Sequence, residues 1–130
     1  MNDPIADLTI RLRNALASGK KEVVLPFSRM KERMAQILKK EGYLDDVAIE
    51  DGEVGKILKI RLGYTDDNKP KARELKRVSK PGRRVYEGYR GLKPIKQGLG
   101  MAILSTPQGL MTDRQARKQK LGGEILIEIF

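Results

Sequence analysis

Residues 56–64 read Lys-Ile-Leu-Lys-Ile-Arg-Leu-Gly-Tyr, and this stretch decides how the first half of the chain folds. From Leu58 to Tyr64, apolar side chains alternate with charged residues and one glycine. Alternation with a period of two is typical of a β-strand that buries one face. We therefore expect residues 56–64 to belong to a sheet that is covered on one side.

Two helices are predicted upstream of this strand, and they supply the cover. The first lies between Asp3, which can cap its N-terminus, and Gly19, which suits the position past its end. The second begins after Ser28 and ends at Gly42. Both have apolar residues at helical spacing, which makes one buried stripe on each: Ile5, Leu8, Leu12 and Ala15, then Met30, Met34, Ile37 and Leu38.

The remaining segments of the first half complete a small sheet. Residues 22–26 are expected to form a short strand. Residues 43–50 are expected to pair with residues 56–64 around a turn at Asp51-Gly52. The order of elements in this half is then α-β-α-β-β.

The chain changes in character after residues 65–70, a polar stretch that resembles a linker. We therefore expect an N-terminal α/β domain over residues 1–68 and a C-terminal, basic, mostly β domain over residues 69–130. One short helix is predicted over residues 113–120, after the cap Thr112. Short strands are predicted around residues 75–79, 84–86, 101–106, 110–112 and 124–130. The predicted fold class is α+β, with the α-β-α-β-β half packed against the mostly β half.

Charge separates the two halves. The chain has 27 Lys and Arg against 17 Asp and Glu, a net charge of +10. Residues 1–68 hold 12 basic and 12 acidic side chains, whereas residues 69–130 hold 15 and 5. The whole excess lies in the second half, which indicates a polyanionic partner for that half.

Composition excludes several functional classes. The chain has no Cys and no His, so disulfide scaffolds, thiolate zinc sites and histidine general bases are excluded. A membrane-spanning helix needs about 20 consecutive apolar residues, and no apolar run in the sequence approaches that length. The N-terminus also lacks the sequence pattern of a signal peptide. We expect a cytoplasmic protein that is not an enzyme, with no cofactor, no metal and no membrane partner.

The basic stretch, residues 69–96, is the strongest functional signal. It holds 11 Lys or Arg and two acids, and Tyr86 and Tyr89 are interleaved with the charge. Arginine matches phosphate oxygens in a bidentate fashion, and tyrosine stacks on bases or riboses. The alternative is a solvated charged face, but such a face usually mixes signs, as residues 43–68 do with three basic and seven acidic side chains. Nucleic-acid contact is favoured, and the charge does not separate RNA from DNA.

Within this stretch, residues 80–84 read Lys-Pro-Gly-Arg-Arg and predict a turn that presents Lys80, Arg83 and Arg84. Proline followed by glycine favours a type II turn with positive φ at Gly82. The segment is either a phosphate clamp or a plain hairpin turn with exposed arginines.

Two hydroxyl residues, Ser105 and Thr106, end a predicted strand just before the turn Pro107-Gln108-Gly109. Hydroxyls in such a place can hydrogen-bond base edges or ribose 2′-hydroxyls where bulky side chains do not fit. Ser-Thr before a turn more often caps the local backbone. Ser105 as a nucleophile would need a base, and no such constellation is evident.

The last two elements add further candidates. Arg114 and Arg117 lie at helical spacing on the short helix and either hold a phosphate or are solvated. Glu124 opens the final strand, where it either accepts a hydrogen bond from a base amino group or RNA hydroxyl, or neutralises a nearby arginine. In that strand, Ile125, Ile127 and Ile129 are expected to form one buried face.

Several ordered motifs together resemble the family of ribosomal protein eight of the bacterial small subunit. The resemblance covers essentially the full chain and rests on these residues: Asp3–Asp7 with Arg11, Arg13 and Asn14; Ser79–Tyr86; Gly98–Gly100; Ser105-Thr106; Gly109; Met111–Arg114; Ala116-Arg117; and Gly122–Glu124.

The resemblance implies a primary rRNA-binding protein that docks on a helix in the central domain of the small-subunit rRNA early in assembly, beside other ribosomal proteins. It implies base contacts by Ser105 and Thr106, with Tyr86 and Glu124 close by. Lysines and arginines, including Arg83 and Arg84, would hold phosphates, and the first helix and the Lys31 region would add contacts from the N-terminal domain. The other basic candidates for RNA contact are Lys80, Arg114 and Arg117. The resemblance also implies repression of the protein's own operon through an mRNA that mimics the rRNA site.

One residue departs from the family pattern, which usually has Ser or Asn where this chain has Pro107. Proline offers neither a backbone donor nor a side-chain hydrogen bond. Recognition would therefore rest more heavily on Ser105 and Thr106. The rival interpretation is a generic basic DNA-binding module, although no helix-turn-helix, zinc-finger or zipper pattern is present.

Overall fold

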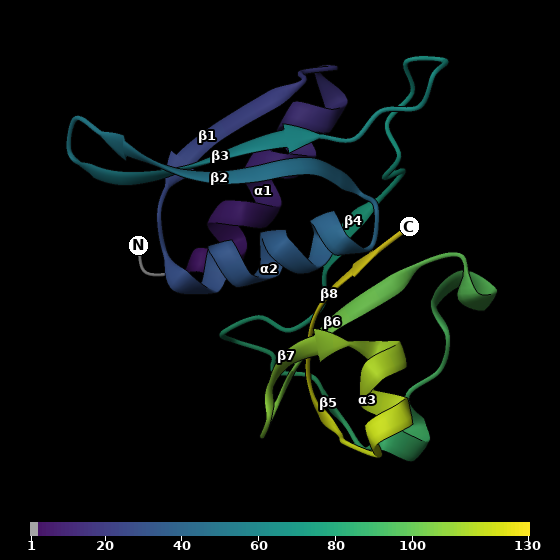
Figure 1. Ribbon diagram of the computed structural model, residues 1–130. Coiled ribbons are helices and arrows are strands. Elements are labelled where there is room, and N and C mark those ends of the chain that lie inside the picture. Colours follow the sequence, from purple (N-terminus) through teal and green to yellow (C-terminus); the bar gives the residue numbers. More distant parts are fainter. Residues whose placement is uncertain (1–2) are drawn as a thin grey trace. The chain divides into compact units, whose positions relative to one another are not determined.

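The computed structural model describes residues 3–130, which form two compact units (Figure 1). The first unit ends at Arg73 and the second comprises Glu74–Phe130. The division lies somewhat later than the expected boundary, because the loop after the first sheet folds back on it. Tyr64 forms a β-bridge with Pro70, and the Lys71 backbone N–H donates to the Gly63 carbonyl at 3.0 Å.

The first unit has the predicted order α-β-α-β-β. Its antiparallel sheet has the strand order β1-β3-β2, and Figure 1 shows the two helices against one face of it. The elements are α1 (Pro4–Ala17), β1 (Glu22–Pro26), α2 (Arg29–Lys40), β2 (Leu44–Gly52) and β3 (Gly55–Leu62).

Strand β3 confirms the alternation from which the fold was predicted. Leu58, Ile60 and Leu62 are buried, whereas Lys59 and Arg61 lie on the other face. The predicted caps are confirmed as well: Asp3 Oδ1 accepts from the Ala6 N–H at 3.1 Å, and Ser28 Oγ accepts from the Lys31 N–H at 3.1 Å. These local contacts set where each helix begins.

The predicted turn at Asp51-Gly52 is wrong. Gly52 pairs with Gly55, so the two-residue loop is Glu53-Val54 and both strands extend further than expected. Gly55 takes φ of +106°, a conformation that L side chains rarely adopt. The chain therefore turns where glycine permits this conformation.

The second unit is an antiparallel sheet with one short helix, and the α+β fold class is confirmed. The strand order is β4-β8-β6-β7, and β5 also pairs with β8. The strands are β4 (Leu75–Arg77), β5 (Tyr86–Glu87), β6 (Met101–Thr106), β7 (Gly109–Thr112) and β8 (Gly123–Ile129). Helix α3 (Asp113–Gln119) begins at the predicted cap, where Thr112 and Gln115 form a capping box.

The expectation that Ile125, Ile127 and Ile129 share one face of β8 is wrong. Ile127 pairs with Ile103, whereas Ile125 pairs with Leu104, so the register shifts between the two. Successive residues of a strand point to opposite faces. Ile125 therefore faces the core cluster beneath α3, where it packs with Leu104, while Ile127 faces the other way. The irregularity decides which face Glu124 occupies.

Residues 3–130 contain no helix of sufficient length and apolar character to cross a lipid bilayer.

Candidate nucleic-acid interface

Three of the predicted site residues lie side by side across three strands. Tyr86 on β5 pairs with Glu124 on β8, and Glu124 pairs with Ser105 on β6. Directly paired residues of antiparallel strands place their side chains on the same face, with Cα atoms about 4.5–5.5 Å apart. We call Tyr86, Glu124 and Ser105 the cross-strand row. It combines an aromatic ring, a carboxylate and a hydroxyl on one face of the sheet.

The ring of the row is open to an incoming partner. Tyr86 is 66% exposed, which is high for a large aromatic residue in a strand. Such a ring offers a stacking surface to an unpaired base or a ribose. The structure thus places an aromatic platform at one end of the row.

Ser105 has an uncommitted hydroxyl. The residue is half-buried, and its side chain makes no hydrogen bond to any other residue in the range 3–130. A hydroxyl can donate one hydrogen bond and accept two, so this group is available to a ligand. Of the two interpretations of Ser105, the geometry favours contact with a partner over backbone capping.

Thr106 is different, because its hydroxyl holds the adjoining turn. Thr106 Oγ1 donates to the Gly109 carbonyl at 2.8 Å and accepts from the Gln108 N–H at 3.1 Å. The capping interpretation is therefore what the structure shows, and one acceptor position of the oxygen remains. Pro107 suits this turn, because the turn uses the N–H of Gln108 and needs none from residue 107.

Glu124 is held by two donors that converge on one of its oxygens. Glu124 Oε2 accepts hydrogen bonds from the Ser79 hydroxyl and from Arg84 Nη1, the latter at 3.1 Å. Neither donor reaches Oε1. The side chain of Glu124 is only 15% exposed, and that of Arg84 is about half exposed. The ion pair confirms that Glu124 neutralises an arginine, and it keeps the carboxylate in the row.

Sequence reasoning gave no role to Ser79, although the residue lies in a quoted motif. Ser79 is 1% exposed, and its hydroxyl also accepts from the Val85 N–H at 3.1 Å. The sequence shows only a serine among basic residues, and its burial appears only in the structure. Its partner Glu124 lies 45 residues further along the chain, too far for any rule of sequence spacing.

Two glycines allow the strands of the row to meet. A Cβ on Gly123 would lie 2.2 Å from the Ser105 carbonyl oxygen, and one on Gly122 would lie 2.5 Å from the Glu87 carbonyl oxygen. Any side chain there would push β6 or the chain after β5 away from β8. The pair Gly122-Gly123 is thus required by close backbone approach, not only by a turn.

The predicted turn at residues 80–84 is present, with a different geometry. Lys80 and Arg83 exchange two backbone hydrogen bonds of 3.0 and 2.9 Å, which closes a hairpin turn around Pro81-Gly82. Gly82 is not among the glycines with positive φ, so the expected type II turn is wrong. Proline at the first position suits a type I turn equally well. Lys80 and Arg83 are exposed, and no ion pair holds either side chain within residues 3–130.

Of the two arginines predicted on the short helix, one is paired and one is available. Arg117 Nη1 is paired with Asp113 Oδ2 at 2.7 Å, and Asp113 Oδ1 accepts from the Ala102 N–H at 3.0 Å. Arg117 therefore neutralises a buried carboxylate that ties α3 to β6. Arg114 is exposed, and no ion pair occupies it within the described part of the chain.

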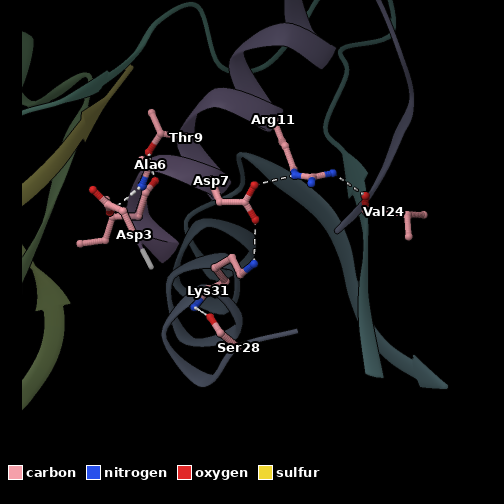
Figure 2. Close-up of polar contacts among 9 residues, drawn as sticks. Asp3, Ala6, Asp7, Thr9, Arg11, Val24, Ser28 and Lys31 are labelled. Carbon is pink, nitrogen blue, oxygen red and sulfur yellow. Dashed lines mark hydrogen bonds and ion pairs between the residues drawn. The ribbon is translucent and has the colours of Figure 1, made fainter. Parts of the chain in front are cut away.

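Lys31 is committed to an interaction inside the first unit (Figure 2). Its ammonium lies 2.7 Å from Asp7 Oδ2, and its side chain is 7% exposed. Burial tends to raise the pKa of Asp7, but hydrogen bonds from Lys31 and Arg11, with their positive charge, lower it below its usual value. Lys31 is thus held in an ion pair within its own unit.

Residues 3–130 contain no cluster of three or more acidic side chains that could hold a metal ion. What the second unit presents instead is the cross-strand row, the hydroxyl-capped turn beside it and a set of exposed cations. This arrangement suits recognition of a nucleic acid by stacking, hydrogen bonding and phosphate contact.

Comparison with known proteins identifies the family of this chain. A family model described as Ribosomal protein S8 matches residues 3–130. The protein named "Small ribosomal subunit protein uS8" of Persephonella marina (strain DSM 14350 / EX-H1) is 46% identical over 136 residues, which cover 100% of this chain and 99% of that protein. The resemblance expected from the motifs is confirmed. The chain belongs to the ribosomal protein S8 family, whose members are structural, non-enzymatic proteins of the ribosome.

Proposed function

We propose that this protein binds directly to a helix in the central domain of the small-subunit rRNA and that it does so early in assembly. As a member of its family the chain is a component of the small ribosomal subunit, in the cytoplasm. The further step, to a particular helix, is supported by the cross-strand row. Tyr86, Glu124 and Ser105 lie together on one face, beside exposed basic residues.

The chemistry of the row favours an irregular RNA over a regular duplex. An exposed aromatic ring can stack on an unstacked base, which a distorted RNA helix or a bulge provides and a regular duplex does not. A carboxylate accepts from base amino groups and from 2′-hydroxyls, and DNA lacks the latter. These features weigh against the generic DNA-binding module.

Phosphate contacts supply affinity and set its salt dependence. Lys80, Arg83 and Arg114 are exposed and available, whereas Arg84 and Arg117 are already paired with carboxylates. Each phosphate neutralised by a cation steepens the decline of the binding constant with salt. We assign Lys80, Arg83 and Arg114 to the backbone, and the row to recognition of a particular RNA.

Footprinting of purified protein on full-length small-subunit rRNA tests the proposal. Protection of one discrete central-domain helix, maintained against excess duplex DNA, is expected. Protection that is spread over the rRNA, or that duplex DNA removes at equal concentration, would contradict it.

We also propose that the protein represses translation of its own operon. The same interface would bind an operon mRNA that presents a similar irregular helix. Contact with neighbouring small-subunit proteins is also proposed. Operon repression is tested by competition between the rRNA fragment and the leader of the protein's own mRNA for one binding site. Binding of both at once would overturn it.

A further inference from the structure

Ser79 is fixed on every side. Its backbone N–H donates to the Ile125 carbonyl at 3.0 Å, and its carbonyl accepts from Arg77 Nε at 2.8 Å. Its hydroxyl oxygen accepts from the Val85 N–H at 3.1 Å. The hydroxyl proton is then directed at Glu124 Oε2, with which Ser79 forms its remaining hydrogen bond. A donor immobilised in this way holds its acceptor in one orientation.

The two donors to Glu124 differ in their access to solvent. The Arg84 side chain is about half exposed and lies in the basic stretch, where RNA phosphates would compete for its guanidinium. Ser79 is buried and no phosphate can reach it. If an RNA phosphate took Arg84 from Glu124, the buried Ser79 hydroxyl would still hold the carboxylate.

We propose that Ser79 is a positioning residue for RNA recognition: it holds Glu124 Oε2 so that the carboxylate stays beside Ser105 and presents an acceptor to an RNA donor group. The inference rests on the proposed RNA-binding function and deepens it. The ligand group it selects is a base amino group or a 2′-hydroxyl, because an acceptor held in place rejects a second acceptor. Ser79 itself does not contact the RNA.

A double-mutant cycle on the full chain tests this role. The variants are Ser79→Ala, Glu124→Ala and the pair, titrated against a central-domain rRNA fragment and a regular RNA duplex of equal length. Ser79→Ala is expected to weaken fragment binding about tenfold or more, as for one hydrogen bond to a charged group, and to leave duplex binding unchanged. In the Glu124→Ala background, where the acceptor of the Ser79 hydroxyl is absent, Ser79→Ala is expected to have little further effect, because the two residues act as a unit.

Two controls make the outcome decisive. Ser18→Ala removes an exposed hydroxyl at the C-terminal cap of α1, which donates only to the Asn14 carbonyl of that helix, and is expected to leave both affinities unchanged. Thermal unfolding checks the fold of each variant. If Ser79→Ala does not fold, Ser79→Cys, which keeps the shape and a weak donor, replaces it in the cycle.

The outcomes separate the two proposals. Equal affinity of the wild-type protein for fragment and duplex would overturn the proposed function, and this inference with it. Wild-type discrimination combined with an unchanged Ser79→Ala affinity would overturn the inference alone. Full additivity of the two losses would also overturn it, because a merely structural serine would act independently of Glu124.

Discussion

Ser105 stands directly opposite Glu124, the first on β6 and the second on β8, and only the side chain of Glu124 has hydrogen-bond partners within residues 3–130. Glu124 has two donors on a single oxygen, while the Ser105 hydroxyl has no partner within residues 3–130. A fixed acceptor beside a free hydroxyl forms a small, directional recognition element. Most of the predictions below follow from this pair and from the backbone that supports it.

The variant Ser105→Ala is expected to lose specific RNA binding and to retain its fold. The hydroxyl makes no hydrogen bond to residues 3–130, so its removal leaves no group of the described protein unpaired. A base-edge contact is worth about 1–3 kcal/mol of discrimination. Gel-shift titration with cognate and non-cognate RNA measures the loss, and thermal unfolding measures the fold. Unchanged affinity would show that Ser105 does not contact the RNA.

Thr106→Ala is expected to weaken specific binding by roughly 1–3 kcal/mol and, unlike Ser105→Ala, to destabilise the turn as well. The hydroxyl bridges Gly109 and Gln108, and each such hydrogen bond is worth about 0.5–1.5 kcal/mol. Thr106→Ser keeps the bridge and is expected to restore both properties. Wild-type affinity of the alanine variant in a gel shift would refute the expectation.

Gly123→Ala is expected to destabilise the second unit. The added Cβ would lie 2.2 Å from the Ser105 carbonyl oxygen, so β6 and β8 must separate. Overpacking of this kind costs typically about 1–3 kcal/mol. The matched control is Gly88→Ala, whose Cβ would meet no atom within 4 Å. Urea unfolding measures both, and equal stability of the two variants would contradict the close approach described here.

Asp7→Asn is expected to destabilise the first unit at neutral pH, because it leaves the buried ammonium of Lys31 without its carboxylate. The folded-state pKa of Asp7 is lowered, so its contribution is fully present above the unfolded pKa of about 3.9 and is lost as pH falls through the folded pKa.

The stability difference between wild type and Asp7→Asn, about 1.5–3 kcal/mol for a hydrogen bond to a charged group, should therefore shrink in acid. Urea unfolding from about pH 7 down to about pH 3 follows it. Asp67→Asn, in an exposed loop, is the control. A difference that stays constant over this range would mean that the carboxylate charge of Asp7 does not stabilise the fold.

Part of the candidate site could be predicted from the sequence, because it depends on patterns among residues that are close together in the chain. The hydroxyl pair before Pro107, the capped helix after Thr112 and the basic stretch 69–96 are all patterns among near neighbours. Whether each side chain is free to bind RNA could not be predicted from the sequence. Lys31 was predicted to lie in an RNA-contacting region and Arg117 was a candidate for phosphate binding, yet each is held by a carboxylate of its own unit. Whether a cation is free depends on contacts that follow only from packing.

The sequence by itself determined the three α-helices, the order of the main strands, the fold class and the family. These features depend on residues a few positions apart in the chain, so they can be recognised in the sequence alone. They are the helix caps, the alternation from Leu58 to Tyr64 and the positions of the glycines. The tertiary structure alone decided the cross-strand row and its support. The register shift in β8 turns Glu124 toward Ser105, and pairing across the sheet brings it to Ser79, 45 residues away. Such contacts arise from strand register, which is set by how the whole sheet packs and not by any local pattern.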